Sequence, residues 1–245
     1  MKIALFSDIH ANLPAFEAFL ADLDSRNPDA VYCLGDLVGY NVWPNEIIEG
    51  IRNRGIATIA GNHDLYVKSL AAVTPELLNY TGKDYAYHII KPENRTYLLT
   101  LPAHILLDYK LNHSPMKILL VHGSPRDVNE YVLEDTDENL LLELMSESGA
   151  DILCAGHSHK PFYRIIQAGN KLKLVINLGS AGKPKDDVMA GCYVMLTLNE
   201  NSSVNVPESI KIEFIRFDYD VEKAAGAIEE SPLPDEFAER LRMAY

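Results

Sequence analysis

The chain has 245 residues, 47% hydrophobic side chains and a net charge of −13 at pH 7. This is enough apolar material for one sizeable domain, which we expect over residues 1–245. The acidic balance argues against nonspecific binding to nucleic acid or an anionic membrane, and no stretch approaches the roughly 20 apolar residues of a membrane span.

No signal peptide is read at the N-terminus. The three cysteines are far apart, and Cys33 and Cys154 lie in apolar runs, which predicts buried free thiols rather than disulfides or a zinc site. We therefore expect a cytoplasmic protein.

The first third of the chain alternates strands and helices. Apolar runs predict strands at 2–6, 30–34 and 56–60. Between them, helical spacing of apolar residues predicts one helix beginning near Asn12 and Pro14 and a second from about residue 44 to residue 53. Such alternation implies βαβ units with parallel strands.

The rest of the chain divides into a helical and a strand-rich part. Residues 65–102 contain no β-rich run and predict two or three helices, with breaks near Pro75, Gly82 and Pro92. Later strands are predicted at 104–111, 117–121, 151–155, 162–166, 172–177, 191–198 and 210–217. Further helices are predicted at 136–148, 220–230 and 234–243. We expect an α/β fold with two sheets, flanking helices and a mostly helical insertion at about 65–102 near the active site.

Five short polar segments each follow an apolar run that predicts a strand. They are Asp8-Ile9-His10, Gly35-Asp36-Leu37-Val38-Gly39, Gly61-Asn62-His63-Asp64, Val121-His122-Gly123 and Gly156-His157-Ser158-His159. Five of the eight histidines fall inside these segments. A histidine that fills a core has no reason to recur at strand ends, so the set predicts a functional site. His88, His104 and His113 are interpreted as structural.

Seven residues of these segments can donate to a metal ion. They are Asp8, His10, Asp36, Asn62, His122, His157 and His159. In an extended chain, residues two apart point to the same side, so each His or Asp pair of that spacing can grip one cation. Seven donors exceed the four of a zinc site. They suit two cations about 3.5–4 Å apart that share a carboxylate, clamp a phosphoryl group and hold a hydroxide between them.

Mixed oxygen and imidazole donors favour Mn²⁺, Fe or Zn²⁺ over Ca²⁺. We expect two divalent ions, with Mn²⁺ first and Fe, Zn²⁺ and Ni²⁺ as alternatives.

His63 remains without a metal role, because it is adjacent to Asn62 and would point elsewhere in an extended segment. Beside a bound phosphate it can protonate the leaving oxygen. Asp64 is predicted to accept a hydrogen bond from His63 and to fix the orientation of the His63 ring. His63 and Asp64 are therefore the predicted catalytic residues. Asn62, His63 and Arg126 are predicted to contact substrate.

Three side chains near the predicted site have a simpler alternative. For Arg126 the alternative to substrate contact is a position in a solvated loop. The same position is the favoured interpretation for Lys183 and Lys185, which follow a glycine-containing turn. The tyrosines of residues 65–102 are predicted to pack in the fold, with stacking on substrate as the alternative.

In this order the five segments resemble the motifs of the calcineurin-like metallophosphoesterase superfamily, over residues 1 to about 190. Residues 35–40, 44–46, 121–126 and 177–182 are similar to its small bacterial and archaeal phosphodiesterase-like branch. The resemblance implies a four-layer α/β/β/α sandwich of two mixed β-sheets with flanking helices and metals at the sheet edges. Two departures, the loop at 40–44 and Leu178 in place of a usual proline, fall where the substrate would enter.

The resemblance also assigns roles to the donors. It implies that one metal is held by Asp8, His10, Asp36 and His159. It implies that the second is held by Asp36, Asn62, His122 and His157. Asp36 would bridge the two, and His63 would be the catalytic acid.

Two functions remain in view. The first is a metal-dependent phosphoric ester hydrolase acting on a small phosphoester or nucleotide-like substrate, with a phosphodiesterase favoured over a phosphomonoesterase by the resemblance alone. The alternative is a catalytically weak or inactive metal-binding scaffold for protein–protein interaction on the same fold. His63 beside a complete donor set favours the enzyme. The oligomeric state is left open, with a homodimer as one option.

Overall fold

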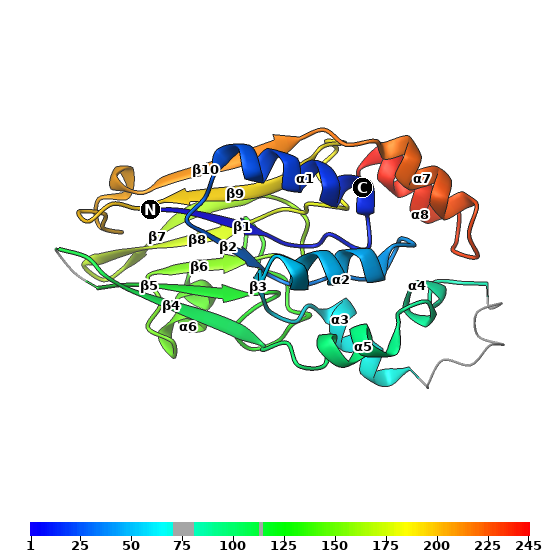
Figure 1. Cartoon of the computed structure of the whole chain (residues 1–245). Coiled ribbons are helices and arrows are strands. Elements are labelled where there is room, and N and C mark those ends of the chain that lie inside the picture. Colours follow the sequence, from blue (N-terminus) through cyan, green and yellow to red (C-terminus); the bar gives the residue numbers. More distant parts are fainter. Residues whose placement is uncertain (71–80, 113–114) are drawn as a thin grey trace.

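Two five-stranded mixed sheets pack face to face with helices on their outer sides (Figure 1). The computed structural model describes residues 1–70, 81–112 and 115–245. The first sheet has the order β10-β9-β1-β2-β3. Its strands are β1 (Lys2–Phe6), β2 (Ala30–Cys33), β3 (Ala57–Thr58), β9 (Gly191–Thr197) and β10 (Lys211–Phe217). The strands β1, β2 and β3 run parallel, and β9 is antiparallel to β1 and β10.

The second sheet has the order β4-β5-β6-β8-β7. Its strands are β4 (His104–Lys110), β5 (Pro115–Val121), β6 (Ile152–Ala155), β7 (Phe162–Ala168) and β8 (Lys171–Asn177). The three central strands β5, β6 and β8 run parallel, and an antiparallel strand closes each edge. The predicted four-layer α/β/β/α class is confirmed.

Helices cover both outer faces of the sandwich (Figure 1). The first sheet is covered by α1 (Leu13–Arg26), α2 (Pro44–Asn53), α7 (Val221–Glu229) and α8 (Glu236–Met243). The second sheet is covered by α6 (Glu138–Ser146). Three helices begin at a side chain that accepts a backbone N–H, as a helix N-cap requires. These caps are Asn12, Asp137 and Asp220.

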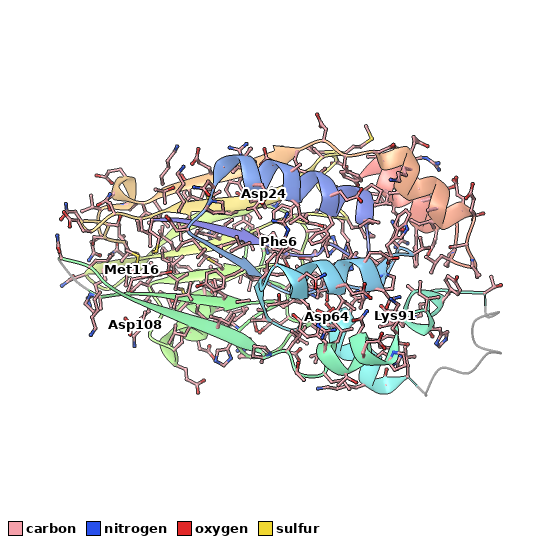
Figure 2. All side chains as sticks on the ribbon, in the orientation of Figure 1. Phe6, Asp24, Asp64, Lys91, Asp108 and Met116 are labelled. Carbon is pink, nitrogen blue, oxygen red and sulfur yellow. The ribbon has the colours of Figure 1, made fainter. Side chains whose placement is uncertain are left out.

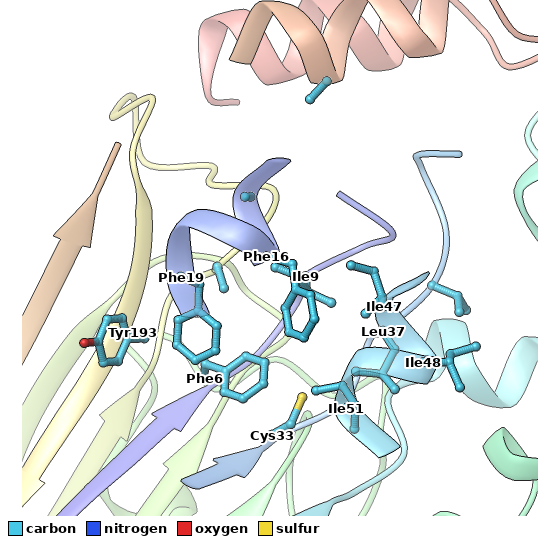
Figure 3. Packing of buried hydrophobic residues seen from close by; sticks show 14 of the residues in the cluster. Phe6, Ile9, Phe16, Phe19, Cys33, Leu37, Ile47, Ile48, Ile51 and Tyr193 are labelled. Carbon is cyan, nitrogen blue, oxygen red and sulfur yellow. The ribbon is translucent and has the colours of Figure 1, made fainter. Parts of the chain in front are cut away.

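Both faces of β1 are buried because one faces helices and the other faces the second sheet. Ala4 and Phe6 lie in the cluster under the helices, whereas Ile3 and Leu5 lie between the sheets. Figure 3 shows Phe6 beside Phe19 of α1, with ring centroids 4.3 Å apart. This double burial explains why β1 reads as a continuous apolar run. It also fixes the end of β1, from which the first polar segment starts.

The third strand is shorter than the predicted 56–60. The N–H of Ala60 donates to the carbonyl of Pro102 at 2.8 Å, so the chain leaves the sheet at this point. The helix predicted at 234–243 begins at Glu236, two residues after Pro234. Both differences concern element ends, where tertiary contacts override local pattern.

The described part of residues 65–102 is helical. It contains the end of α3 (Asn62–Tyr66), a 3₁₀ turn η1 (Val67–Ser69), α4 (Tyr85–His88) and α5 (Pro92–Leu98). The breaks predicted at Gly82 and Pro92 precede α4 and open α5. Pro75 lies outside the described residues, as does His113. None of the helices in the described ranges is long and apolar enough to cross a membrane.

Candidate metal centre

All five polar segments meet at one end of the sandwich. Asp8 and His10 follow β1, Asp36 follows β2, and His122 follows β5. The chain after β6 adds the last two histidines, and Asn62 opens α3. Parallel neighbours in each sheet end at the same edge, so strand order alone brings most of these residues together.

The backbone at five of the seven predicted ligands is left-handed, not extended. Ten non-glycine residues in the described part have positive φ, and five of them are predicted metal ligands. Their φ angles are 58° at Asp8, 49° at His10, 56° at Asp36, 63° at His157 and 60° at His159. The same-side argument from extended spacing is therefore wrong in its geometry. A residue in this region costs about 1–3 kcal/mol and persists where the surrounding structure enforces it, often at functional sites.

One group of donors is formed by Asp8, His10 and His159. The Nε2 atoms of the two histidines lie 3.2 Å apart. The Oδ1 atom of Asp8 lies 3.1 Å from Nε2 of His159 and 3.6 Å from Nε2 of His10. Asp36 approaches the same group, with Oδ2 at 3.6 Å from Nε2 of His10.

A second group lies next to the first, and Asp36 stands between them. It contains Asp36, His122 and His157. Nε2 of His122 lies 3.4 Å from Oδ2 of Asp36 and 3.0 Å from Oδ1 of Asn62. The seven predicted donors therefore form two adjacent groups, and the Asp36 carboxylate of the second group also approaches His10 of the first.

The histidine tautomers suit metal binding. Nδ1 of His10 lies 2.9 Å from the carbonyl of Val38, and Nδ1 of His122 lies 2.7 Å from the carbonyl of Leu34. Nδ1 of His159 is hydrogen-bonded to the carbonyl of Lys183. A carbonyl can only accept, so each Nδ1 carries the proton. Each neutral imidazole then presents the Nε2 lone pair to the centre, as metal-binding histidines do.

The donors also fit a cation electrostatically. Oδ1 of Asp8 is buried and has no hydrogen-bond partner, although it faces two imidazole nitrogens. Such an orphaned carboxylate oxygen is costly unless a cation satisfies it. Burial raises the pKa of Asp8, but His159 and His10 outweigh this and hold the pKa well below its usual range. The arrangement can therefore hold divalent metal ions.

His122 shows how the carboxylates act when no cation is bound. Burial alone would lower its pKa, but the Asp36 and Asp8 carboxylates and the Leu34 carbonyl together outweigh burial and raise the pKa to about 10. A proton then takes the place on His122 that a metal would occupy.

His63 lies beside the seven predicted metal donors but is not one of them. Its ring centroid lies 4.9 Å from that of His10 and 4.7 Å from that of Tyr40. Its backbone N–H donates to Oδ1 of Asp36 at 2.8 Å, and burial lowers its pKa to about 4. His63 also completes a third donor group with His10 and Asp36, so the geometry alone allows a ligand role.

The predicted hydrogen bond from His63 to Asp64 is absent, and this prediction is wrong. Asp64, labelled in Figure 2, is fully buried and accepts three backbone N–H groups. The donors are Asp36 at 2.8 Å, Leu37 at 3.0 Å and Gly61 at 2.9 Å. Asp64 therefore ties the Asp36 loop to the start of α3, and its role is to hold donors in place.

Tyr87 is the residue that contacts the His63 ring. Its hydroxyl is hydrogen-bonded to Nδ1 of His63, and the two rings are stacked at an interplanar angle of 12°. Gly39 makes room for this pair. A Cβ there would lie 2.6 Å from Nδ1 of His63 and 3.0 Å from the Tyr87 hydroxyl. The sequence gives no sign of the contact, because 24 residues separate the two rings.

Two cationic side chains differ from their predicted roles. Arg126 is half-exposed and forms ion pairs with Glu130 and Glu143, so the structure gives no support to its predicted contact with substrate. Lys183, interpreted as solvated, is 2% exposed, and its Nζ lies 4.7 Å from the centroid of the Tyr40 ring.

Comparisons with known proteins agree on one family. Residues 1–201 match the calcineurin-like phosphoesterase superfamily domain. The uncharacterized protein MJ0912 of Methanocaldococcus jannaschii is 33% identical over 98% of this chain and 96% of its own length.

Two crystal structures share the fold. That of a metallophosphoesterase from Sphaerobacter thermophilus has a TM-score of 0.77 at 24% identity, over 100% of this chain and 99% of the other. That of the hypothetical protein PH1004 from Pyrococcus horikoshii OT3 has a TM-score of 0.75 at 23% identity, over 98% and 97% of the two chains. On the family match and the identity to MJ0912, the chain belongs to the calcineurin-like phosphoesterase superfamily.

Proposed function

We propose that this protein is a phosphodiesterase that works with two divalent ions, with Mn²⁺ as the preferred metal. The observation that carries the proposal is Asp36, which belongs to the donor group with His122 and His157 and whose Oδ2 also lies 3.6 Å from Nε2 of His10 in the other group. When bound at these groups, the ions supply water activation and stabilisation of the charge that develops on phosphoryl oxygens. A cytoplasmic location is part of the proposal, and the buried free thiols suit a reducing compartment.

His63 is the proposed general acid. It lies against His10 and Tyr40 at the rim of the donor groups, where a phosphate bound to the centre would come within its reach. The hydroxyl of Tyr87 on Nδ1 orients the ring, so Nε2 is the atom left to face a leaving oxygen. Burial disfavours the charged imidazolium of free His63. The negative charge of a bound phosphate would oppose that effect, so proton donation is coupled to substrate binding.

Asp64 fixes the positions of the donors and of His63 through the backbone N–H groups around it. The carboxylate bridges the loop that carries Asp36 and the turn that carries Asn62 and His63. Three N–H donors on one buried carboxylate leave little freedom for the turn. Such rigidity is what a site needs if its donors are to be held in one geometry before substrate arrives.

The proposal is tested by stripping the purified protein of metal and reloading it with Mn²⁺. Hydrolysis of bis-p-nitrophenyl phosphate and of p-nitrophenyl phosphate is then measured, with Ni²⁺, Zn²⁺ and Fe²⁺ as parallel arms. We expect turnover of the diester to exceed that of the monoester. Metal binding without turnover of either ester under any ion would support the scaffold instead. Faster turnover of the monoester would keep the hydrolase but overturn the preference for diesters.

A further inference from the structure

A cavity of about 480 Å³ opens beside Asn62 and His63. Its wall is largely aromatic, formed by Tyr40, Tyr66, Tyr87 and Phe237. These rings come from distant parts of the sequence: the loop before α2, the end of α3, the helix α4 and the helix α8. Cavities of this size and composition are typical of sites that bind small molecules.

The rings form one connected set around His63. Tyr66 meets Tyr87 edge to face at 5.0 Å, and Tyr40 meets Phe237 in the same way at 5.0 Å. His63 touches both pairs, through its stacked contact with Tyr87 and its tilted contact with Tyr40. Phe237 and Tyr87 are buried, whereas Tyr66 is 36% exposed at the opening. The cavity is thus walled on both sides of the proposed acid.

The position of His63 decides which part of a substrate this cavity would hold. A general acid lies within hydrogen-bond reach of the oxygen that it protonates, and that oxygen belongs to the leaving alcohol. Because His63 and the donor Asn62 both line the cavity, and the His63 ring lies 4.9 Å from that of His10, the cavity adjoins the donors and a leaving alcohol protonated by His63 extends into it.

The charges around the cavity indicate what that alcohol carries. Among the described residues that line it, Lys83 and Asp84 are the fully charged ones, and both belong to the segment before α4 rather than to the buried wall. The hydroxyl of Tyr66 donates to Asp84 at 3.2 Å, which places this acid at the Tyr66 opening. Lys183 is buried against the Tyr40 ring but does not line the cavity, so the described wall offers no buried cation for a second phosphate. It offers ring edges and faces, which prefer another flat ring.

We propose that the substrate is a phosphoester whose leaving alcohol carries an uncharged aromatic ring, and that this cavity binds the ring. The inference rests on the proposed function and narrows its substrate class. In the step, water oxygen bonds to phosphorus, the P–O bond to the ring-bearing alcohol breaks, and the alcohol oxygen takes the proton from His63. The attacking water releases a proton, and His63 is reprotonated from solvent. Esters that expel a phosphate, as polyphosphates do, are excluded by the same wall.

The test is calorimetric binding of two phosphonates to the Mn²⁺-loaded protein. Phenylphosphonate and methylphosphonate share the group that binds the centre and differ by one ring. We expect phenylphosphonate to bind about 10-fold more tightly, the ratio that one well-packed ring contact gives. Phenylphosphonate with a carboxylate on its para position should bind more weakly than phenylphosphonate. Equal binding of the phenyl and methyl compounds, or tighter binding of the carboxylate, overturns the proposal.

Variants of a tyrosine in the cavity wall test whether the phenyl ring of the ligand binds in this cavity. Tyr66→Ala should reduce the phenyl-to-methyl ratio to about 3-fold or less, while Tyr66→Phe, which keeps the ring and loses only the hydroxyl, should retain it. Tyr66 is exposed enough that its truncation leaves the core intact. Tyr163→Ala, a change at an exposed tyrosine on β7, is the matched control and should leave the ratio unchanged. A ratio that survives in Tyr66→Ala places the ring elsewhere and overturns the assignment.

The two levels of the proposal fail separately. If no ester is hydrolysed under any ion, the phosphodiesterase function is wrong, whatever the phosphonates do. If bis-p-nitrophenyl phosphate is hydrolysed but methyl- and phenylphosphonate bind alike, the function stands and the ring cavity does not.

Discussion

The donor groups and the aromatic cavity meet at His63, but the fold holds them in different ways. The donors sit at the ends of buried strands, with imidazoles anchored to the carbonyls of Leu34 and Val38. The cavity is built by short helices and loops, and Tyr66 is partly open to solvent. The strand ends hold the metal donors in the rigid geometry that catalysis needs. The residues that line the cavity lie on short helices and loops, so they can be substituted without disturbing the donors. We therefore expect variants of the donors to abolish function and variants of the wall to redirect it.

The largest effect is expected from Asp36→Asn, which removes the shared charge while keeping the size of the side chain. The carboxylate that lies between the two donor groups loses its charge, so metal content and hydrolysis should fall together, the latter by about 10³-fold or more. Metal content by mass spectrometry and initial rates on bis-p-nitrophenyl phosphate would check this. Asp22→Asn, at a partly exposed carboxylate on α1, is the control. An Asp36→Asn protein with full metal content would show that Asp36 is not the bridge.

The second largest effect is expected from His63→Ala. A lost general acid costs about 10²–10⁴-fold in rate, so hydrolysis should fall in that range while both metals stay bound. The deficit should shrink for esters whose leaving alcohol is more acidic, because such alcohols need less protonation. Loss of one metal in the His63→Ala protein would instead make His63 a ligand, as its nearness to His10 and Asp36 allows.

Asp64→Asn should act on stability rather than on chemistry. The amide replaces one accepting oxygen with an NH2 group, which donates toward backbone groups that are themselves N–H donors. We expect the free energy of unfolding to fall by about 3 kcal/mol, as for other buried donors left without an acceptor. Urea denaturation of the metal-free protein measures this. An unchanged midpoint would mean that the turn is held by other contacts.

Metal affinity should depend on pH through His122. Its pKa is raised to about 10, so below that pH the metal-free protein carries a proton where the metal must bind. Binding releases this proton, and the apparent affinity for Mn²⁺ should therefore weaken by about tenfold per pH unit as the pH falls from 8.5 to 6.5. Titrations across this range would show it. An affinity that is flat with pH would mean that His122 does not exchange a proton for the metal.

How much of this site the sequence predicts differs between the two regions. The donors were predictable because each follows an apolar strand, and parallel strands end at one edge whatever the details of their loops. Their left-handed backbone was not, since the same residue spacing suits an extended chain. Asp64 was misassigned for a related reason. Adjacency to His63 suggested a side-chain contact, but α3 begins at Asn62 and turns the carboxylate back onto the backbone.

Tyr66 and Tyr87 of the aromatic wall were predicted to pack in the fold, with stacking on substrate as the alternative, whereas Tyr40 and Phe237 were assigned no individual role. The proposed role of the wall as a ring site depends on tertiary structure. Tyr40, Tyr87 and Phe237 meet only when the loop before α2, the helix α4 and the helix α8 come together. Tyr40 ends the segment 35–40 that carries part of the family resemblance, but that segment does not indicate which rings Tyr40 meets. The helices α4 and α8 carry no motif, and α4 spans four residues, too few for a periodic signal. Contacts between short, distant elements leave no local pattern from which they can be inferred.

The smallest expected effect comes from Tyr87→Phe, which tests whether the two regions act as one. The change keeps the stacked ring and removes only the hydroxyl on Nδ1 of His63. One hydrogen bond contributes about 1 kcal/mol, so hydrolysis should slow by about fivefold with metal content unchanged. Tyr97→Phe, at another tyrosine of the same segment, is the control. If Tyr87 acts through His63, it should have no further effect in the His63→Ala background, because a double-mutant cycle then shows full coupling. Independent losses that multiply would mean that Tyr87 supports the fold or the ring cavity instead of the acid.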